Sequence, residues 1–291
     1  MNLRIHHRTR YSYDCPVSFG NHALYLRPRD SFGLTVRSFD LATTPESTRR
    51  WVTDVEGNVI RVCSFGLQTS ECLEVDLRMT VELEEQNPFD FILDANATGY
   101  PFSYGDSDRK ALSPYLATGA EETATRWFKE AGVAPETHPD LVQFLSDMNS
   151  AVHDRIGYVR RDEEGIQTST ETVDLGTGSC RDMAFLFMEG IRGLGMAARF
   201  VSGYLYDPPE GEDHMFNRAV GSMHAWVEVY LPGAGWKGFD PTNGILANGF
   251  FLPSAVSYNP RRVDPVQGAF YSDTPTPSHL HVDLDIEELP S

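Results

Sequence analysis

The chain has 291 residues, 41% of them hydrophobic, which is enough for one large domain or two ordinary domains with a buried core. Asp and Glu outnumber Lys and Arg by 42 to 24, which gives a formal net charge of −18. A nucleic acid or an anionic membrane surface would repel such a chain, so neither is expected as a partner. No apolar run reaches the length of a membrane span.

Cysteine usage indicates the redox environment. The four cysteines are widely scattered along the chain, at Cys15, Cys63, Cys72 and Cys180. The first residues, Met-Asn-Leu-Arg-Ile-His-His-Arg, lack the apolar stretch of a signal peptide. We therefore expect reduced thiols in a cytoplasmic protein rather than a disulfide framework.

The first part of the chain, residues 1–85, has the pattern of an antiparallel β domain. From Leu73 to Leu83 apolar residues alternate strictly with polar ones, which is the period of a strand with one buried face. Residues 54–58 have the composition of a turn before a further strand. Residues 86–118 are rich in Pro, Gly and aromatic residues without a clear period, and we predict an ordered connector there.

Helical patterns open the next unit, residues 119–270, which we predict to be an α+β core. One pattern covers residues 120–131, and a second covers residues 139–155 with Pro139 at the first helical position. A third helix is expected to begin at Cys180.

Strands are predicted again at residues 198–205 and 223–231, where apolar residues cluster or alternate. The last stretch, residues 271–291, is rich in Pro and then acidic, and we expect an acidic, solvated C-terminal tail.

Cys180 lies between a glycine-rich turn and a run that is apolar on most sides, as in a buried helix. Unpaired backbone N–H groups and the positive end of the helix dipole gather at the first turn of such a helix. This setting favours the thiolate, which is the nucleophilic form of cysteine. Because a free cysteine is more often a small buried hydrophobic residue, a catalytic role also requires a base and a group that orients it.

His224 is a candidate base because it lies on the polar face of an alternating strand. A turn, Pro-Gly-Ala-Gly, leads into a second strand that ends at Asp240, since the following Pro241 cannot donate to the sheet. Asp240 is therefore a candidate for the orienting carboxylate.

The register of this hairpin decides whether the two side chains meet. If Leu231 pairs with Trp236, Asp240 falls on the face opposite to His224. If Leu231 pairs with Gly235, Asp240 becomes a diagonal neighbour of His224 on the same face, within side-chain reach. A histidine–carboxylate pair therefore requires the second register, or a bulge with the same effect.

The three groups fit one chemistry. A histidine beside a thiol takes its proton, and a carboxylate behind the imidazole fixes the tautomer and supports the charge. Taken singly, Cys180 could be a packing residue, His224 a surface histidine and Asp240 a residue at the end of a strand.

The chain resembles the transglutaminase-like cysteine protease superfamily in four stretches. They are Gly-Ser-Cys-Arg-Asp at 178–182, Gly-Met-Ala-Ala-Arg-Phe-Val-Ser-Gly-Tyr at 195–204, His-Ala-Trp-Val-Glu-Val-Tyr at 224–230 and Gly-Trp-Lys-Gly-Phe-Asp-Pro-Thr at 235–242. The first part is similar to the β-rich N-terminal region of the bacterial members, with matching text at 7–13, 24–29 and 54–58. The resemblance reaches about residue 270. It implies a papain-like core in which a helix bearing Cys180 packs on an antiparallel sheet bearing His224 and Asp240, as a Cys-His-Asp triad.

The sequence departs from the family pattern beside the cysteine, where Gln-Asp is common and Arg181-Asp182 stands here. Asp174 occupies the position of the papain-type oxyanion glutamine. The backbone N–H of Cys180 is therefore the expected oxyanion donor, with Gln167 as a second candidate. Asp182 is expected to support the loop or to cap the helix rather than to take part in catalysis.

These observations predict acyl transfer from a peptide or amide through a thioester at Cys180. Hydrolysis is the expected outcome because water is the default acceptor, and we expect Trp226 and Trp236 to be packing residues rather than walls of an amine pocket. Transfer to an amine, as in a transglutaminase, and a catalytically silent binding or scaffold protein of the same fold remain open. No Cys-x-x-Cys or His-x-x-x-His pair predicts a metal site, no cofactor is expected, and substrate identity and oligomeric state stay open.

Overall fold

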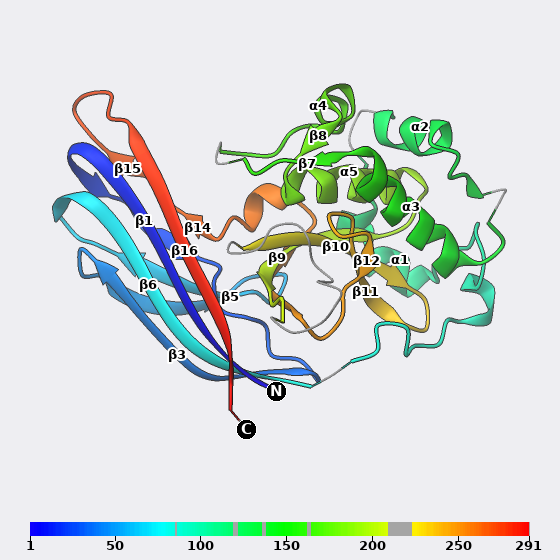
Figure 1. Cartoon of the computed structure of the whole chain (residues 1–291), viewed down its shortest axis with the longest axis horizontal. Coiled ribbons are helices and arrows are strands. Elements are labelled where there is room, and N and C mark those ends of the chain that lie inside the picture. Colours follow the sequence, from blue (N-terminus) through cyan, green and yellow to red (C-terminus); the bar gives the residue numbers. More distant parts are fainter. Residues whose placement is uncertain (85, 119–121, 136–137, 162–163, 209–222, 291) are drawn as a thin grey trace.

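The computed structural model describes residues 1–84, 86–118, 122–135, 138–161, 164–208 and 223–290. Two units lie side by side in Figure 1: a β unit made of long, curved strands, and a core in which helices cover one face of a sheet. The predicted α+β class, with a β unit before a mixed core, is confirmed.

The β unit consists of two antiparallel sheets that enclose one apolar cluster. The first sheet has the order β15-β1-β6-β3, with β16 also paired to β1, and the second has the order β14-β2-β5-β4. Their bounds are β1 Asn2–Phe19, β2 His22–Leu24, β3 Leu34–Thr44, β4 Thr48–Thr53, β5 Val59–Ser64, β6 Thr69–Leu83, β14 Val266–Gln267, β15 Phe270–Tyr271 and β16 Ser278–Leu289. Along β6 the alternating apolar residues point inward, as predicted, and Leu77 and Val81 are fully buried.

The C-terminal segment, for which a solvated tail was predicted, is a strand, although most of its side chains are exposed. Ser278–Leu289 form β16, which pairs antiparallel with β1 from Tyr13↔Ser278 to Asn2↔Leu289. Figure 1 shows this last strand (red) lying along the first strand of the chain (blue). The β unit is therefore built from both ends of the chain, with the core inserted between them.

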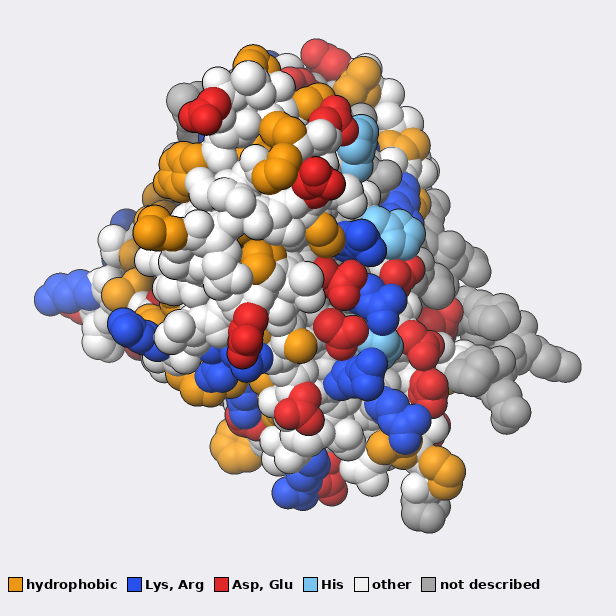
Figure 2. Space-filling model, turned by 90° about the vertical axis from the view of Figure 1, so that its left-hand side faces the viewer, with side chains coloured by type: hydrophobic (Ala, Val, Ile, Leu, Met, Phe, Trp, Pro, Cys, Tyr) orange, Lys and Arg blue, Asp and Glu red, His pale blue; other side chains and the backbone are white. Residues whose placement is uncertain are grey.

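One pair of opposite charges contributes to the pairing of this acidic segment. In the register of β1 with β16, Arg4 lies opposite Glu287, whereas Arg8, which lies opposite Asp283, forms its ion pair with Asp76 of β6. The Arg4 guanidinium and the Glu287 carboxylate are 3.4 Å apart. Figure 2, which faces this side of the molecule, shows a band in which acidic, basic and histidine side chains alternate. Opposite charges on neighbouring strands stabilise the pairing of an otherwise polar edge strand.

The core is a five-stranded antiparallel sheet with the order β12-β11-β10-β9-β13, covered by helices. The strands are β9 Ala198–Leu205, β10 His224–Leu231, β11 Gly235–Asp240, β12 Ile245–Leu246 and β13 Phe251–Ser257, and the helices are α2 Thr123–Glu130, α3 Leu141–Arg155, α4 Ser169–Leu175 and α5 Cys180–Gly193. A parallel pair, β7 Gly157–Tyr158 and β8 Thr177–Gly178, precedes α5. The apolar residues of α5 and of one face of β10 form a single buried cluster, so α5 is the central helix of the core.

The start of α3 differs from the prediction. Asp140, not Pro139, is adjacent to the first helical residue, and the Asp140 side chain accepts a hydrogen bond from the backbone N–H of Gln143. An aspartate in this N-cap position satisfies one of the unpaired N–H groups of the first turn, which fixes the boundary.

The connector between the units contains the short helix α1 Asp106–Ala111 and the 3₁₀ turns η1 Ala95–Ala97 and η2 Ser113–Leu116. Tyr104 attaches it to the core, since its hydroxyl donates to the carbonyl of Tyr230 and accepts from the N–H of Ala197. The connector is ordered by aromatic anchors of this kind.

Two buried contacts join the β unit to the core. The side chain of Asn58 donates to the carbonyl of Val256 and accepts from its N–H, so the turn at residues 54–58 pairs with β13 as a strand would. The Tyr204 hydroxyl donates to the carbonyl of Leu26 and lies 3.1 Å from Nδ1 of His7. Burial, together with the charge of His6, lowers the pKa of His7 to about 4, so this ring is neutral at neutral pH.

Removal of residues 278–291 tests the role of β16. We expect the backbone amides of β1 to exchange with solvent markedly faster in the truncated chain, because β1 then becomes an exposed edge. Hydrogen exchange followed by mass spectrometry measures this, with peptides from α5 as the internal control. Unchanged protection of β1 would contradict the pairing.

Candidate active site

Three elements bring the predicted site residues together. Cys180 is the first residue of α5, His224 the first of β10 and Asp240 the last of β11. The exposed fractions are 9% for Cys180, 1% for His224 and 0% for Asp240. The site is therefore nearly closed to solvent, where electrostatic interactions are strong.

The hairpin adopts the register that a histidine–carboxylate pair requires. Leu231 pairs with Gly235, and Val227 with Phe239, so Asp240 extends onto the face of β10 that carries His224. His224 Nε2 and Asp240 Oδ2 are 2.9 Å apart. The prediction that these two side chains share a face and a hydrogen bond is confirmed. Gly235, with φ of +73°, supplies the left-handed backbone conformation at the end of the turn.

The other ring nitrogen of His224, Nδ1, is available to interact with the Cys180 thiol. Among the described residues, Nδ1 has no hydrogen-bond partner of suitable geometry, although it is buried. Burial alone would lower the pKa of His224, but Asp240 and the neighbouring Cys180 side chain outweigh burial and raise the pKa to about 10. The ring is therefore a cation at neutral pH, held by Asp240 on one side and adjacent to Cys180 on the other.

Aromatic rings cover the histidine. The ring of Trp226 stacks on His224 with centroids 6.1 Å apart and planes 24° apart, and Phe251 lies 6.0 Å from the same ring. Trp226 is buried, as expected of a packing residue, but Trp226 and Trp236 also line a cavity of about 470 Å³ on the sheet face that carries His224. The two rings contribute to the burial of His224, and both His224 and Asp240 are almost completely buried.

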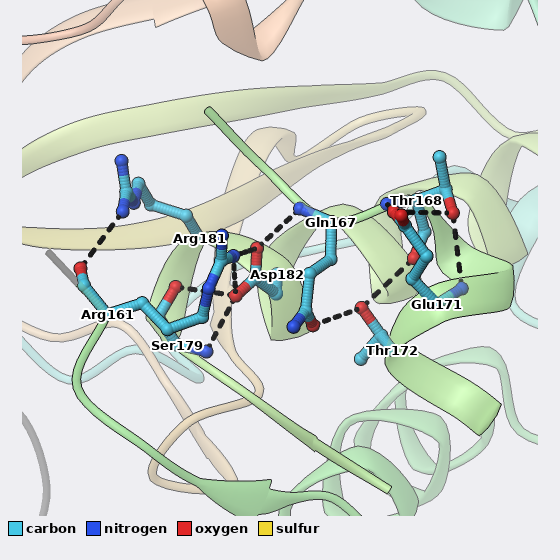
Figure 3. Close-up of polar contacts among 8 residues, drawn as sticks. All are labelled: Arg161, Gln167, Thr168, Glu171, Thr172, Ser179, Arg181 and Asp182. Atoms are coloured by element: carbon cyan, nitrogen blue, oxygen red, sulfur yellow. Dashed lines mark hydrogen bonds and ion pairs between the residues drawn. The ribbon is translucent and has the colours of Figure 1, made fainter. Parts of the chain in front are cut away.

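Asp182 organises the turn that presents Cys180 (Figure 3). Its carboxylate accepts hydrogen bonds of 2.8 Å from the N–H and hydroxyl of Ser179, from the N–H of Gln167 and from the guanidinium of Arg161. Burial alone would raise the pKa of Asp182, but these donors lower it, so the group is an anion. The prediction that Asp182 supports the loop and caps the helix is confirmed.

The two expected oxyanion donors, the backbone N–H of Cys180 and the side chain of Gln167, differ in their surroundings. As the first residue of α5, Cys180 has a backbone N–H without an acceptor inside the helix, which fits the proposed role. The side-chain oxygen of Gln167 accepts from the hydroxyl of Thr172, so Gln167 belongs to the Asp182 network in Figure 3. Among the described residues, no recorded contact links it to Cys180.

The residue that departs from the family pattern, Arg181, lies at the edge of this network. Its guanidinium donates to the carbonyl of Arg161. Burial raises the pKa of Asp264, and the charge of Arg181 offsets part of that rise. The first turn of α5 therefore carries a cation that interacts with an acidic group of the loop after β13.

Sequence reasoning missed the residues that hold the turn after Asp240. Asn149, fully buried on α3, donates to the backbone carbonyls of Asp240 and Ile245. Asn243 and the N–H of Thr242 donate to the two oxygens of the Asp240 carboxylate. The available signals were an asparagine on the apolar face of a helix and an Asn-Gly pair, which is typical of a tight turn.

The described residues contain no group of three His, Cys, Asp or Glu side chains that could hold a metal ion. Within the same residues, no helix has the length and hydrophobicity needed to span a membrane.

The variant Asp182→Asn tests the support of the Cys180 turn. It removes the fully buried carboxylate that pairs with Arg161, so we expect the free energy of unfolding at neutral pH to fall by about 3 kcal/mol. Because the folded pKa of Asp182 is lowered, its contribution is present above the unfolded pKa and is lost as pH falls through the folded value. Denaturant titrations at several pH values measure this, with the exposed Asp174→Asn as control. A loss that does not shrink in acid would contradict the ionic role.

Both units of the chain are similar to known proteins. The bacterial transglutaminase-like N-terminal region matches residues 3–82, and the transglutaminase-like superfamily matches residues 129–241. An uncharacterized protein of Mycobacterium tuberculosis is 27% identical over 298 residues, which cover 97% of this chain and 91% of that protein. One from Mycobacterium leprae is 22% identical over 287 residues, covering 92% of each.

Among solved structures, the fold is similar to that of a candidate cysteine protease from Cytophaga hutchinsonii. The TM-score is 0.72 at 17% identity, and the match covers 100% of this chain and 92% of the other. Residues 3–82 therefore match the bacterial transglutaminase-like N-terminal region, and residues 129–241, which include the Cys180 helix and the His224–Asp240 hairpin, match the transglutaminase-like superfamily.

Proposed function

We propose that the protein hydrolyses a peptide or amide bond through a thioester at Cys180. One observation carries this proposal. His224 is anchored to Asp240 through Nε2, while its Nδ1 has no geometrically suitable partner among the described residues and the Cys180 side chain is its neighbour. A thiol, a histidine and an orienting carboxylate in this order are the parts of a cysteine nucleophile and its base.

In the acylation step, the Cys180 sulfur, as a thiolate beside the His224 cation, attacks the carbonyl carbon of the substrate. The carbonyl oxygen becomes an oxyanion that accepts the backbone N–H of Cys180 at the start of α5. When the carbonyl re-forms, the C–N bond breaks and His224 Nδ1 gives its proton to the departing amine. The products are a thioester and a free amine.

In the deacylation step, His224, now neutral, takes a proton from water, and the oxygen attacks the thioester carbon. The C–S bond breaks, a carboxylic acid leaves, and the thiolate–imidazolium pair is restored. A primary amine could attack the same thioester and give a new amide. Hydrolysis is the proposed outcome because transfer to an amine requires a pocket at the thioester that holds the amine and excludes water, and neither Cys180 nor His224 lines the cavity at Trp226 and Trp236.

Selective alkylation tests the nucleophile. We expect iodoacetamide at neutral pH to modify Cys180 in the folded protein before the other three cysteines, because Cys180 alone lies beside a charged histidine at a helix start. Asp240→Asn should slow this modification, because an amide can hold the imidazole in the wrong tautomer. Peptide mass spectrometry over time identifies the site. Equal labelling of all four thiols would contradict the thiolate–imidazolium pair.

Product partition tests the outcome. The protein is incubated with a panel of cleavable peptides and amides, with and without excess cadaverine, and Cys180→Ser serves as the control. We expect carboxylic acid as the main product, and about 10⁴-fold slower turnover in Asp240→Asn, the loss that the equivalent change causes in a serine protease. If the amide of cadaverine were the main product, the proposal of hydrolysis would be overturned, and the proposed thioester at Cys180 would stand. No product of either kind would favour a binding protein.

A further inference from the structure

We propose that Asn243 is a positioning residue of this site, which fixes the carboxylate oxygen of Asp240 that His224 uses. The inference rests on the proposed function of Cys180, His224 and Asp240, and it adds a residue that acts through Asp240 rather than on the substrate.

The contacts of the Asp240 carboxylate carry the proposal. Its Oδ2 atom accepts two hydrogen bonds, one from Nδ2 of Asn243 at 2.7 Å and one from Nε2 of His224 at 2.9 Å. Its Oδ1 atom accepts from the backbone N–H of Thr242 at 2.9 Å. Donors on both oxygens prevent rotation of the carboxylate. Asn243 is the donor that shares the Oδ2 atom with His224.

The backbone of the turn is held by other groups. The N–H of Gly244 donates to the carbonyl of Asp240 at 2.8 Å, and Nδ1 of His153 donates to the carbonyl of Thr242 at 2.8 Å. Asn149 adds a bond to the Asp240 carbonyl. Because Asn243 is itself half-buried and these bonds do not involve it, loss of its side chain leaves the turn in place. The contact between Asn243 and Asp240 is therefore separable from folding.

The position of Oδ2 determines the direction of the histidine ring. His224 is attached to the carboxylate through Nε2, so a rotation of the carboxylate turns the ring and moves Nδ1 relative to the Cys180 sulfur. A neutral amide donor is suited to this task, because it fixes the oxygen without supplying a charge that would compete with the imidazolium. Asn243 thus keeps Nδ1 directed at the nucleophile.

The test uses the full chain and needs no substrate. The rate of Cys180 alkylation by iodoacetamide is measured across pH for wild type, Asn243→Ala and Asn243→Asp, with Asn248→Ala as a matched control. Asn248 accepts from the N–H of Phe250 and has no recorded contact with Asp240. A second measurement follows the low-field proton resonance of His224 Nε2–H by NMR, and thermal unfolding confirms that each variant is folded.

We expect Asn243→Ala to slow alkylation at neutral pH by about tenfold, the effect of one lost hydrogen bond, and to move the rate profile toward alkaline pH. The Nε2–H resonance should shift or broaden. Asn243→Asp keeps the size of the side chain but replaces the donor by an acceptor, so it should slow alkylation more than Asn243→Ala does. Asn248→Ala should match wild type in both readouts.

A wild-type pH profile and resonance in Asn243→Ala would overturn the proposal, as would a loss of thermal stability with neither readout changed. The two readouts also separate the proposals. If wild-type Cys180 is not alkylated selectively but the resonance still shifts in Asn243→Ala, the proposed function fails and the positioning by Asn243 stands.

Discussion

The buried hydrogen bond between His224 and Asp240 is the constraint on which the rest of the core depends. It exists only in one register of the β10–β11 hairpin, and a slip of one residue would move Asp240 to the other face of the sheet. The pairing of Leu231 with Gly235 sets the register at the turn, and the bonds of Asn149 set it again at the far end. The hairpin is therefore fixed at both ends around the site.

Much of the site could be predicted from local sequence. The alternation of residues around His224 predicts which face of the strand carries its side chain, and the apolar run after Cys180 predicts the helix. The register stayed open between two choices, because a turn with a glycine on each side of one residue permits both. Packing decides between them, since only one choice gives the buried carboxylate a partner.

The supporting residues could not be predicted, for a physical reason. Asn149 contacts Asp240 across 91 positions of the chain, and Arg161 reaches Asp182 across 21. Such contacts depend on how helices pack on the sheet, which periodicity does not reveal. The acidic C-terminal segment was misjudged for the same reason. Arg4 on its partner strand and Glu287 are 283 positions apart in the chain. The composition of the segment therefore indicated a polar stretch but did not reveal the strand with which it pairs.

The closure of the first sheet by β16 has a consequence for biosynthesis. The ribosome makes β1 well before β16, and the whole segment that bears Cys180, His224 and Asp240 emerges between them. The β unit therefore cannot complete its first sheet during translation of the core, and until β16 has emerged β1 has a free edge exposed to other nascent chains. The core can therefore become ordered before the β unit is complete.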